Sequence, residues 1–263
     1  MPEVIVNNLR LNYQEAGFGP QTLVCLHGIS SNSRSWRCQL KGLAERYRVI
    51  AWDARGYGQS QDASAPFPMS AFAADLAGLL DHLGVSQAVI VGLSMGGVIA
   101  QEFYRHYPER VKALVLADTN TGGGARPEAE RQVRLQARMK AIETLTPLEM
   151  ARQRGPALLS PHASAALQQE VIEMISEIHP AGYRHAALAL DAADTRAVLP
   201  VVQVSTLVMW GEEDTVTPRA EAEALYNLLP AHLRSFKTIP GAGHLSNLEQ
   251  PRLFNQAILN FKF

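Results

Sequence analysis

Short, largely apolar runs recur along the chain, and each of them ends at a glycine or a polar residue. The clearest runs cover residues 22–26, 48–52, 88–91, 113–117 and 206–210. A continuous apolar run of this length is typical of a strand buried on both faces, as in a parallel sheet. We predict a strand for each run, together with two short strands around Asn7-Asn8 and one over residues 235–239.

Helical patterns separate these strands. Leucines at positions 76, 79, 80 and 83 have the spacing of one helix face, with Ser70 as the predicted N-cap and Gly84 just beyond the C-terminus. Residues 98–104 and 251–261 are also expected to be helical. Strands that alternate with helices in this way predict an α/β fold, with a mostly parallel sheet flanked by helices.

The alternation stops between residues 120 and 195. After the glycines at 122–124, only helical patterns follow, over residues 127–142, 147–153, 163–178 and 181–192. We therefore predict a core made of residues 1–120 and 196–263, and a helical cap, or lid, made of residues 121–195. The cap is expected to lie over the carboxyl edge of the sheet.

Composition narrows the class of protein. The 263 residues are 47% hydrophobic and 19% charged, which is enough apolar material for a large core. The net charge of −1 argues against nucleic acid as a partner. Two cysteines do not make a disulfide framework. We see no signal peptide and no apolar run near the roughly 18 residues of a membrane span, so we expect a soluble, cytoplasmic protein.

One segment carries the clearest chemical signal. The run over 88–91 leads directly into Gly92-x-Ser94-x-Gly96, and a helical segment follows at once. A serine on so sharp a turn has a strained backbone, and the glycines on either side remove side chains that would clash. The turn lifts the hydroxyl clear of the sheet edge. A plain glycine-rich turn is the alternative, but the flanking strand and helix favour Ser94 as a nucleophile.

A serine nucleophile needs a base, usually a histidine that a carboxylate orients. Of eight histidines, only His244 lies in a glycine-rich loop directly after the last predicted strand. The acid is expected between serine and histidine in the chain, after a late strand, and Asp214 occupies that position. Asp118 also follows a strand and is the alternative acid. The predicted catalytic residues are Ser94, Asp214 and His244.

Acyl transfer also needs donors for the oxyanion that develops on the carbonyl oxygen. We predict the N–H of Met95, directly after the serine, as one donor. The N–H of Ile29, in the loop that follows the first central strand, is the second predicted donor, because Gly28 permits a tight turn there. His27 is then expected to hold this loop rather than act as a base. An ordinary turn at the end of a strand is the alternative interpretation.

The sequence predicts neither a metal nor a cofactor. No pair of histidines or cysteines falls at ligand spacing within a convincing element. The glycines at 92–97 are not followed by the Lys-Ser/Thr pair of a phosphate-binding loop. The expected partner is a small-molecule substrate. The sequence leaves the oligomeric state open, and a homo-oligomer is compatible with it.

Five motifs together resemble the α/β-hydrolase superfamily, in its order and spacing: His27-Gly28, Asp53-x-Arg55-Gly56-x-Gly58-x-Ser60, Gly92-x-Ser94-x-Gly96-Gly97, Gly211-x-x-Asp214 and Gly243-His244. The resemblance covers essentially the whole chain except the helical insertion. It implies a serine hydrolase with a cap domain that shapes the substrate pocket. It also implies that Asp53 and Arg55 fix their loop rather than take part in catalysis.

Three segments are similar to 3-oxoadipate enol-lactonases: Pro180–Ala187, Asp191-x-x-Asp194-x-Arg196 and Gly211-x-x-Asp214-x-x-Thr217-Pro218. This likeness implies a hydrolase for a small ester or lactone. The alternatives are a C–C bond hydrolase of aromatic degradation, a cofactor-free perhydrolase, and a ligand receptor that keeps the triad without turnover. A serine at position 94 argues against dehalogenase and epoxide hydrolase relatives, which use aspartate there.

Charge in the predicted cap bears on the substrate. Residues 121–155 contain seven Arg or Lys residues against four Glu residues, a local positive excess. A lactonase for an acidic lactone would need cations near its pocket. A solvated helix face is the simpler explanation for any single arginine.

Overall fold

The computed structural model describes residues 2–263, and in this part of the chain eight strands form one sheet. The strands are β1 (Glu3–Val6), β2 (Leu9–Ala16), β3 (Gln21–Leu26), β4 (Tyr47–Asp53), β5 (Ala88–Leu93), β6 (Val111–Ala117), β7 (Thr206–Gly211) and β8 (Arg234–Ile239). Their order across the sheet is β1-β2-β4-β3-β5-β6-β7-β8. Strand β2 pairs antiparallel with β1 and with β4. The remaining pairs, which join β4, β3, β5, β6, β7 and β8 in that order, are all parallel. The predicted α/β fold with a mostly parallel sheet is confirmed.

Helices of the core pack on this sheet. They are α1 (Arg37–Gly42), α2 (Met69–His82), α3 (Met95–His106), α8 (Arg219–Leu228), α9 (Ser246–Glu249) and α10 (Pro251–Asn260). Helix α3 contacts β3, β5 and β6, while α2 packs on α3 and α1 on α10. Every residue of β5 and β7 is buried, as expected for strands covered on both faces.

The start of α2 differs from the prediction. Ser70 is not its N-cap: the helix begins at Met69, after Pro68 in an extended conformation. The Met69 side chain is buried in the core, which explains why the helix extends two residues further toward the N-terminus. At the other end, Gly84 has a positive φ of 65°, as predicted for a residue that follows a helix C-terminus.

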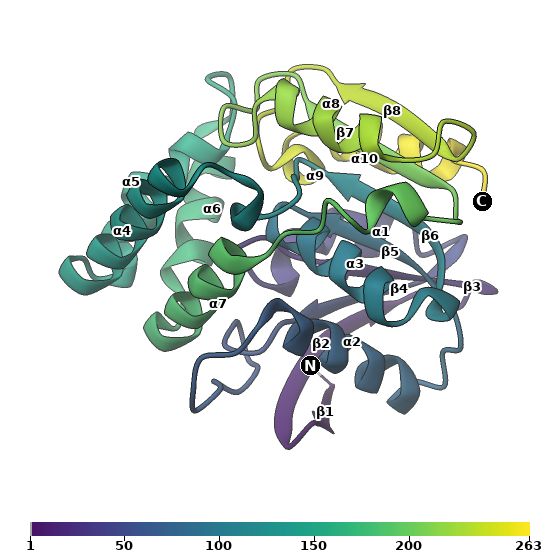
Figure 1. Ribbon diagram of the computed structural model, residues 1–263, viewed down its shortest axis with the longest axis horizontal. Coiled ribbons are helices and arrows are strands. Elements are labelled where there is room, and N and C mark those ends of the chain that lie inside the picture. The colour runs from purple at the N-terminus through teal and green to yellow at the C-terminus, as the bar shows by residue number, and fades with distance from the viewer. Residues whose placement is uncertain (1) are drawn as a thin grey trace.

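Between β6 and β7 the chain forms the helical insertion (Figure 1). Its helices are α4 (Glu128–Thr144), α5 (Pro147–Arg154), α6 (Ala165–Ser176) and α7 (Pro180–Ala192). Helix α4 packs against α7, and α5 packs against α6. Figure 1 shows this group, coloured teal to green, at one side of the sheet. No helix within residues 2–263 combines the length and the apolar character that crossing a membrane would need.

Because the central strands are parallel, their carboxyl ends meet at one edge of the sheet. The loops after β3, β5, β6, β7 and β8 therefore bring together segments that are far apart in the sequence. Residues 27–31, 94, 118–120, 214–217 and 244 all belong to these loops. The candidate site lies here.

Candidate active site

Ser94 occupies the turn between β5 and α3 with φ 56° and ψ −120°. A non-glycine residue in such a conformation costs about 1–3 kcal/mol, so its surroundings must hold it in place. The Ser94 N–H donates to the carbonyl of Ala117 (3.0 Å), and the Thr119 hydroxyl donates to the Ser94 carbonyl (2.6 Å). Two bonds from the neighbouring strand and its loop thus fix the strained turn.

The glycines around Ser94 are required by close backbone contacts. A Cβ on Gly92 would lie 2.3 Å from the Gly96 carbonyl oxygen, and a Cβ on Gly96 would lie 2.0 Å from the Leu26 carbonyl oxygen. Both distances are far below van der Waals contact. Helix α3 can therefore start directly against the ends of β3 and β5, and this packing sets the position of the serine.

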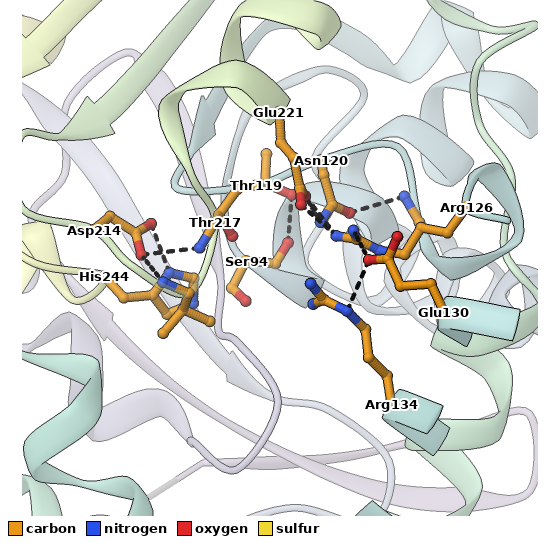
Figure 2. A network of polar contacts seen from close by, with 12 residues as sticks. Ser94, Thr119, Asn120, Arg126, Glu130, Arg134, Asp214, Thr217, Glu221 and His244 are labelled. Atoms are coloured by element: carbon orange, nitrogen blue, oxygen red, sulfur yellow. Dashed lines mark hydrogen bonds and ion pairs between the residues drawn. The ribbon is translucent and has the colours of Figure 1, made fainter. Parts of the chain in front are cut away.

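His244 and Asp214 form a buried hydrogen-bonded pair. His244 Nδ1 donates to Asp214 Oδ2 over 2.8 Å, and the two side chains are 4% and 0% exposed. The other carboxylate oxygen accepts the N–H groups of Val216 (2.8 Å) and Thr217 (3.0 Å). With Nδ1 as the donor, Nε2 of the neutral ring is left as an acceptor. Figure 2 shows His244 between Asp214 and Ser94.

The structure distinguishes between the two candidate acids. Asp118 accepts the N–H of Gly211 (2.7 Å) and the hydroxyl of Ser246, and no hydrogen bond joins it to His244. Burial, together with the nearby charge of Asp214, raises the pKa of Asp118 to about 7. The carboxylate that contacts the imidazole of His244 is therefore Asp214, the acid that the sequence predicts from its position after a late strand.

The loop after β3 lies directly against the serine. A Cβ on Gly28 would lie 3.1 Å from Ser94 Cβ, and Ile29 lines the same cavity as Ser94 and His244. Within residues 2–263, neither the N–H of Ile29 nor that of Met95 donates to a protein acceptor. Both predicted oxyanion donors therefore lie near the serine without a protein acceptor in this part of the chain.

His27 has a structural environment. Its Nδ1 donates to the Gly28 carbonyl (2.9 Å), and its Nε2 accepts the N–H of Ala54 (3.1 Å). Burial lowers the pKa of His27, which favours the neutral ring that these two bonds require. Both ring nitrogens are used to hold the loops after β3 and β4, as the sequence predicts for this residue.

Asp53 and Arg55 also fix loops. Asp53 accepts the N–H groups of Ser33 (2.7 Å) and Gln59 (2.9 Å). Arg55 forms a bidentate pair with the buried carboxylate of Asp75, at 2.6 and 2.7 Å. None of these bonds reaches Ser94 or His244: Asp53 holds loop backbone, and Arg55 joins its loop to Asp75 on helix α2.

Sequence reasoning missed the residue that holds the histidine loop. Glu249 accepts the N–H of Gly243 (2.8 Å) and the N–H of Ser160 in the insertion (3.0 Å). One carboxylate thereby joins the His244 loop to the helical insertion. A glutamate in the short helix α9 gives no periodic signal, and only its position soon after the histidine motif could have suggested this role.

Two small cavities meet at the serine, with volumes of about 70 and 30 Å³. The larger is bounded by a polar network in which Arg126 binds Glu221 at 2.6 Å and Glu130 at 2.8 Å, and Arg134 also binds Glu130 at 3.1 Å (Figure 2). These bonds connect α4 of the insertion with α8 of the core. Both parts of the fold therefore enclose the space in front of Ser94.

The fold and these loops define the class of protein. A model of the α/β hydrolase fold matches residues 21–251. The chain belongs to the α/β hydrolase fold family.

Individual relatives match along nearly the whole chain. The 3-oxoadipate enol-lactonase 2 of Acinetobacter baylyi is 29% identical over 254 residues, which are 95% of this chain and 92% of that protein. A 2-hydroxy-6-oxononadienedioate/2-hydroxy-6-oxononatrienedioate hydrolase of Paraburkholderia phymatum is 30% identical, with 96% and 91% covered. Among solved structures, a thermophilic esterase from Thermogutta terrifontis with bound malate has a TM-score of 0.89 at 30% identity, covering 98% of this chain and 96% of that one.

Proposed function

We propose that this protein is a serine hydrolase that cleaves a small ester or lactone through an acyl-enzyme. The observation that carries the proposal is the buried 2.8 Å bond between His244 and Asp214 beside a serine held on a strained turn. This arrangement leaves Nε2 of His244 as the base for the Ser94 proton. The enol-lactonase and esterase relatives support ester or lactone bonds as the target.

In the proposed reaction, Ser94 Oγ attacks the carbonyl carbon while His244 Nε2 takes its proton. Negative charge moves to the carbonyl oxygen, which the N–H groups of Ile29 and Met95 stabilise; one such donor is commonly worth about 3–4 kcal/mol. The tetrahedral intermediate expels the alcohol or enol oxygen, which receives the proton from His244. In a lactone this leaving group stays attached to the acyl chain.

Water then completes the cycle. It attacks the acyl-enzyme carbonyl as His244 takes one of its protons, and the same two N–H groups hold the second oxyanion. Collapse of this intermediate releases the carboxylic acid and returns the proton to Ser94. Asp214 stays ionised throughout and stabilises the imidazolium that forms in both steps.

A second candidate is hydrolysis of a C–C bond next to a carbonyl. The relative from Paraburkholderia phymatum, named as a hydrolase of an oxo-dienedioate, supports this alternative. The same serine, base and oxyanion donors would serve it. A receptor that binds such a ligand without turnover is the third candidate, because it would need the pocket but not the chemistry.

A substrate panel separates these functions. Parent protein and the Ser94→Ala variant are assayed on p-nitrophenyl acetate, on lactones and on vinylogous diketones, with the exposed Ser86→Ala as control. We expect turnover of an ester or a lactone, lost at least about a thousandfold in Ser94→Ala and unchanged in the control.

Other outcomes contradict the proposal in different ways. Preferred turnover of the diketones would identify a C–C hydrolase. Ligand binding without turnover in the parent would identify a receptor. Activity that persists in Ser94→Ala would show that the assigned mechanism is wrong.

A further inference from the structure

The cavity walls in front of Ser94 contain five arginines that differ in their pairing. Three of them have carboxylate partners, namely Arg126 with Glu221, Arg131 with Asp191 (3.4 Å) and Arg134 with Glu130. The other two, Arg138 on α4 and Arg154 on α5, line the cavity shared by Ser94 and His244. Within residues 2–263, neither forms an ion pair or a side-chain hydrogen bond.

The two unpaired arginines raise each other's electrostatic cost. Burial lowers the pKa of Arg138, and the neighbouring positive charges of Arg154 and Arg134 lower it further. Nε of Arg154 is fully buried and has no hydrogen-bond partner. Guanidinium groups removed from water are normally paired with carboxylates or phosphates. Arg138 and Arg154 are half-buried and have no carboxylate partner within residues 2–263, so an anion bound in the cavity would compensate their charge.

Two buried tyrosines lie behind the cavity wall, since neither Tyr57 nor Tyr183 lines the cavities at Ser94. The hydroxyl of Tyr183 is buried without a partner within residues 2–263, whereas that of Tyr57 lies beside the backbone of Ser30. Gly56 and Gly182 bring their segments together, because a Cβ on Gly56 would lie only 2.6 Å from the Gly182 Cα. Burial and the proximity of Tyr183 raise the pKa of Tyr57, so its hydroxyl keeps its proton and can donate.

Buried donors without partners are rare in native proteins, because each one costs about 1–3 kcal/mol. Arg154 Nε and Ser30 Oγ are two such groups, and both residues line the cavity that Ser94 and His244 share. Both groups can donate, and the local charge is positive. This combination matches the oxygens of an anion.

We infer that Arg138 and Arg154, together with the hydroxyl of Ser30, form a carboxylate-binding subsite, and that the substrate is an ester or lactone that carries a carboxylate away from the scissile bond. This inference rests on the proposed function. The two guanidiniums would bind the carboxylate oxygens, and the Ser30 hydroxyl would donate a further hydrogen bond. The subsite then aligns the scissile carbonyl with Ser94, so binding at one end of the substrate contributes to catalysis at the other.

The test uses esters that differ only at the far end of the acyl chain. Mono-p-nitrophenyl glutarate carries a carboxylate where p-nitrophenyl pentanoate carries a methyl group, and the succinate and adipate monoesters vary the distance to it. We expect the parent to favour one anionic ester by about 10- to 100-fold in kcat/KM, the range of a buried charged hydrogen bond.

Variants connect this preference to the subsite. Arg138→Gln and Arg154→Gln should each lose most of the preference by slowing the anionic ester, while the rate on the pentanoate changes by no more than a few-fold. Arg154→Lys keeps the charge and should retain part of the preference. The matched control is Arg152→Gln, an exposed arginine two residues away on the same helix, which should behave as the parent does.

Two results would overturn the inference. One is a parent that hydrolyses the neutral ester as well as the anionic esters. The other is an equal loss on both esters in the arginine variants, which would indicate a purely structural role.

A separate binding measurement tests the subsite if the proposed function is wrong. If the parent hydrolyses none of these esters, glutarate binding to Ser94→Ala is measured by calorimetry. Binding that Arg154→Gln weakens about tenfold supports the subsite, whereas the absence of binding rejects it.

Discussion

Replacing Asp214 by asparagine changes one atom at the centre of the site. The side-chain oxygen can still accept the N–H groups of Val216 and Thr217, which now hold the carboxylate at 2.8 and 3.0 Å. The amide NH₂ group then takes the place of the oxygen that lies 2.8 Å from His244 Nδ1. The amide NH₂ and the Nδ1–H of His244 are both donors and cannot bond to each other. The imidazole of His244 must therefore lose its Nδ1 proton and carry a proton on Nε2 instead.

A proton on Nε2 removes the base. His244 can no longer accept the proton of Ser94, and the imidazolium that forms during attack loses its buried counter-charge. We expect kcat to fall by about 10⁴, the effect typical of a triad aspartate replaced in this way. This loss corresponds to about 5 kcal/mol of transition-state stabilisation. The fold should persist, because the loop bonds of residue 214 are kept.

The assay is steady-state hydrolysis of the best ester from the substrate panel, with circular dichroism to monitor folding. Asp118→Asn is the matched control, since Asp118 is a buried carboxylate nearby that does not bond to His244. It should retain activity within about tenfold. A loss of less than tenfold in Asp214→Asn, or a large loss only in Asp118→Asn, would refute the reasoning and assign the acid to Asp118.

Three further predictions concern stability. Asp118→Asn should gain stability relative to the parent as pH rises from about 4 to about 7. In this range the carboxyl ionises in the unfolded parent (ordinary pKa 3.8) but stays protonated in the folded parent (pKa about 7), so rising pH favours unfolding of the parent alone. Urea unfolding across this pH range measures the effect, and parallel curves would contradict it. Gly92→Ala should lose about 1–3 kcal/mol and most activity, because its Cβ would lie 2.3 Å from the Gly96 carbonyl oxygen; an unchanged melting temperature would exclude the clash. Arg55→Gln should lose about 3–5 kcal/mol in urea unfolding, since it leaves the buried Asp75 carboxylate without its cation and with only the amide of Asn7 (3.0 Å) as a side-chain donor; a loss below 1 kcal/mol would contradict this.

Much of the sheet could be predicted because its strands are buried on both faces. Continuous apolar runs such as 88–91 have few interpretations other than central strands, and the elements around Ser94 follow from glycine spacing. The pairing of Asp214 with His244 was also accessible, since parallel strands bring their carboxyl ends to one edge. The helices of the insertion were found from their patterns and the prolines between them.

What the sequence did not predict depends on tertiary contacts. Helices α1 and α8 have weak patterns and were missed, and the N-cap of α2 was misplaced because burial of Met69 overrides the capping preference of Ser70. Counting charges in residues 121–155 showed a positive excess but not which arginines lack partners. That distinction depends on where Glu130, Asp191 and Glu221 lie in space.

The clustering of the two tyrosines was equally inaccessible. Tyr57 and Tyr183 are far apart in the chain, and only the close approach of Gly56 to Gly182 brings their segments together. Neither glycine carries a local signal for this contact, because its partner lies in another part of the fold. The contact between the loop after β4 and helix α7 is therefore a property of the assembled fold.

The central claim is that the Asp214–His244 pair makes Ser94 a nucleophile. Labelling with diethyl p-nitrophenyl phosphate, followed by peptide mass spectrometry, tests it most directly, because only an activated serine displaces p-nitrophenol rapidly and keeps the diethylphosphoryl group. We predict one adduct per chain, on Ser94, absent in Ser94→Ala and formed at least about a hundredfold more slowly in His244→Ala. An adduct on another residue, or equal labelling of the parent and His244→Ala, would contradict the account.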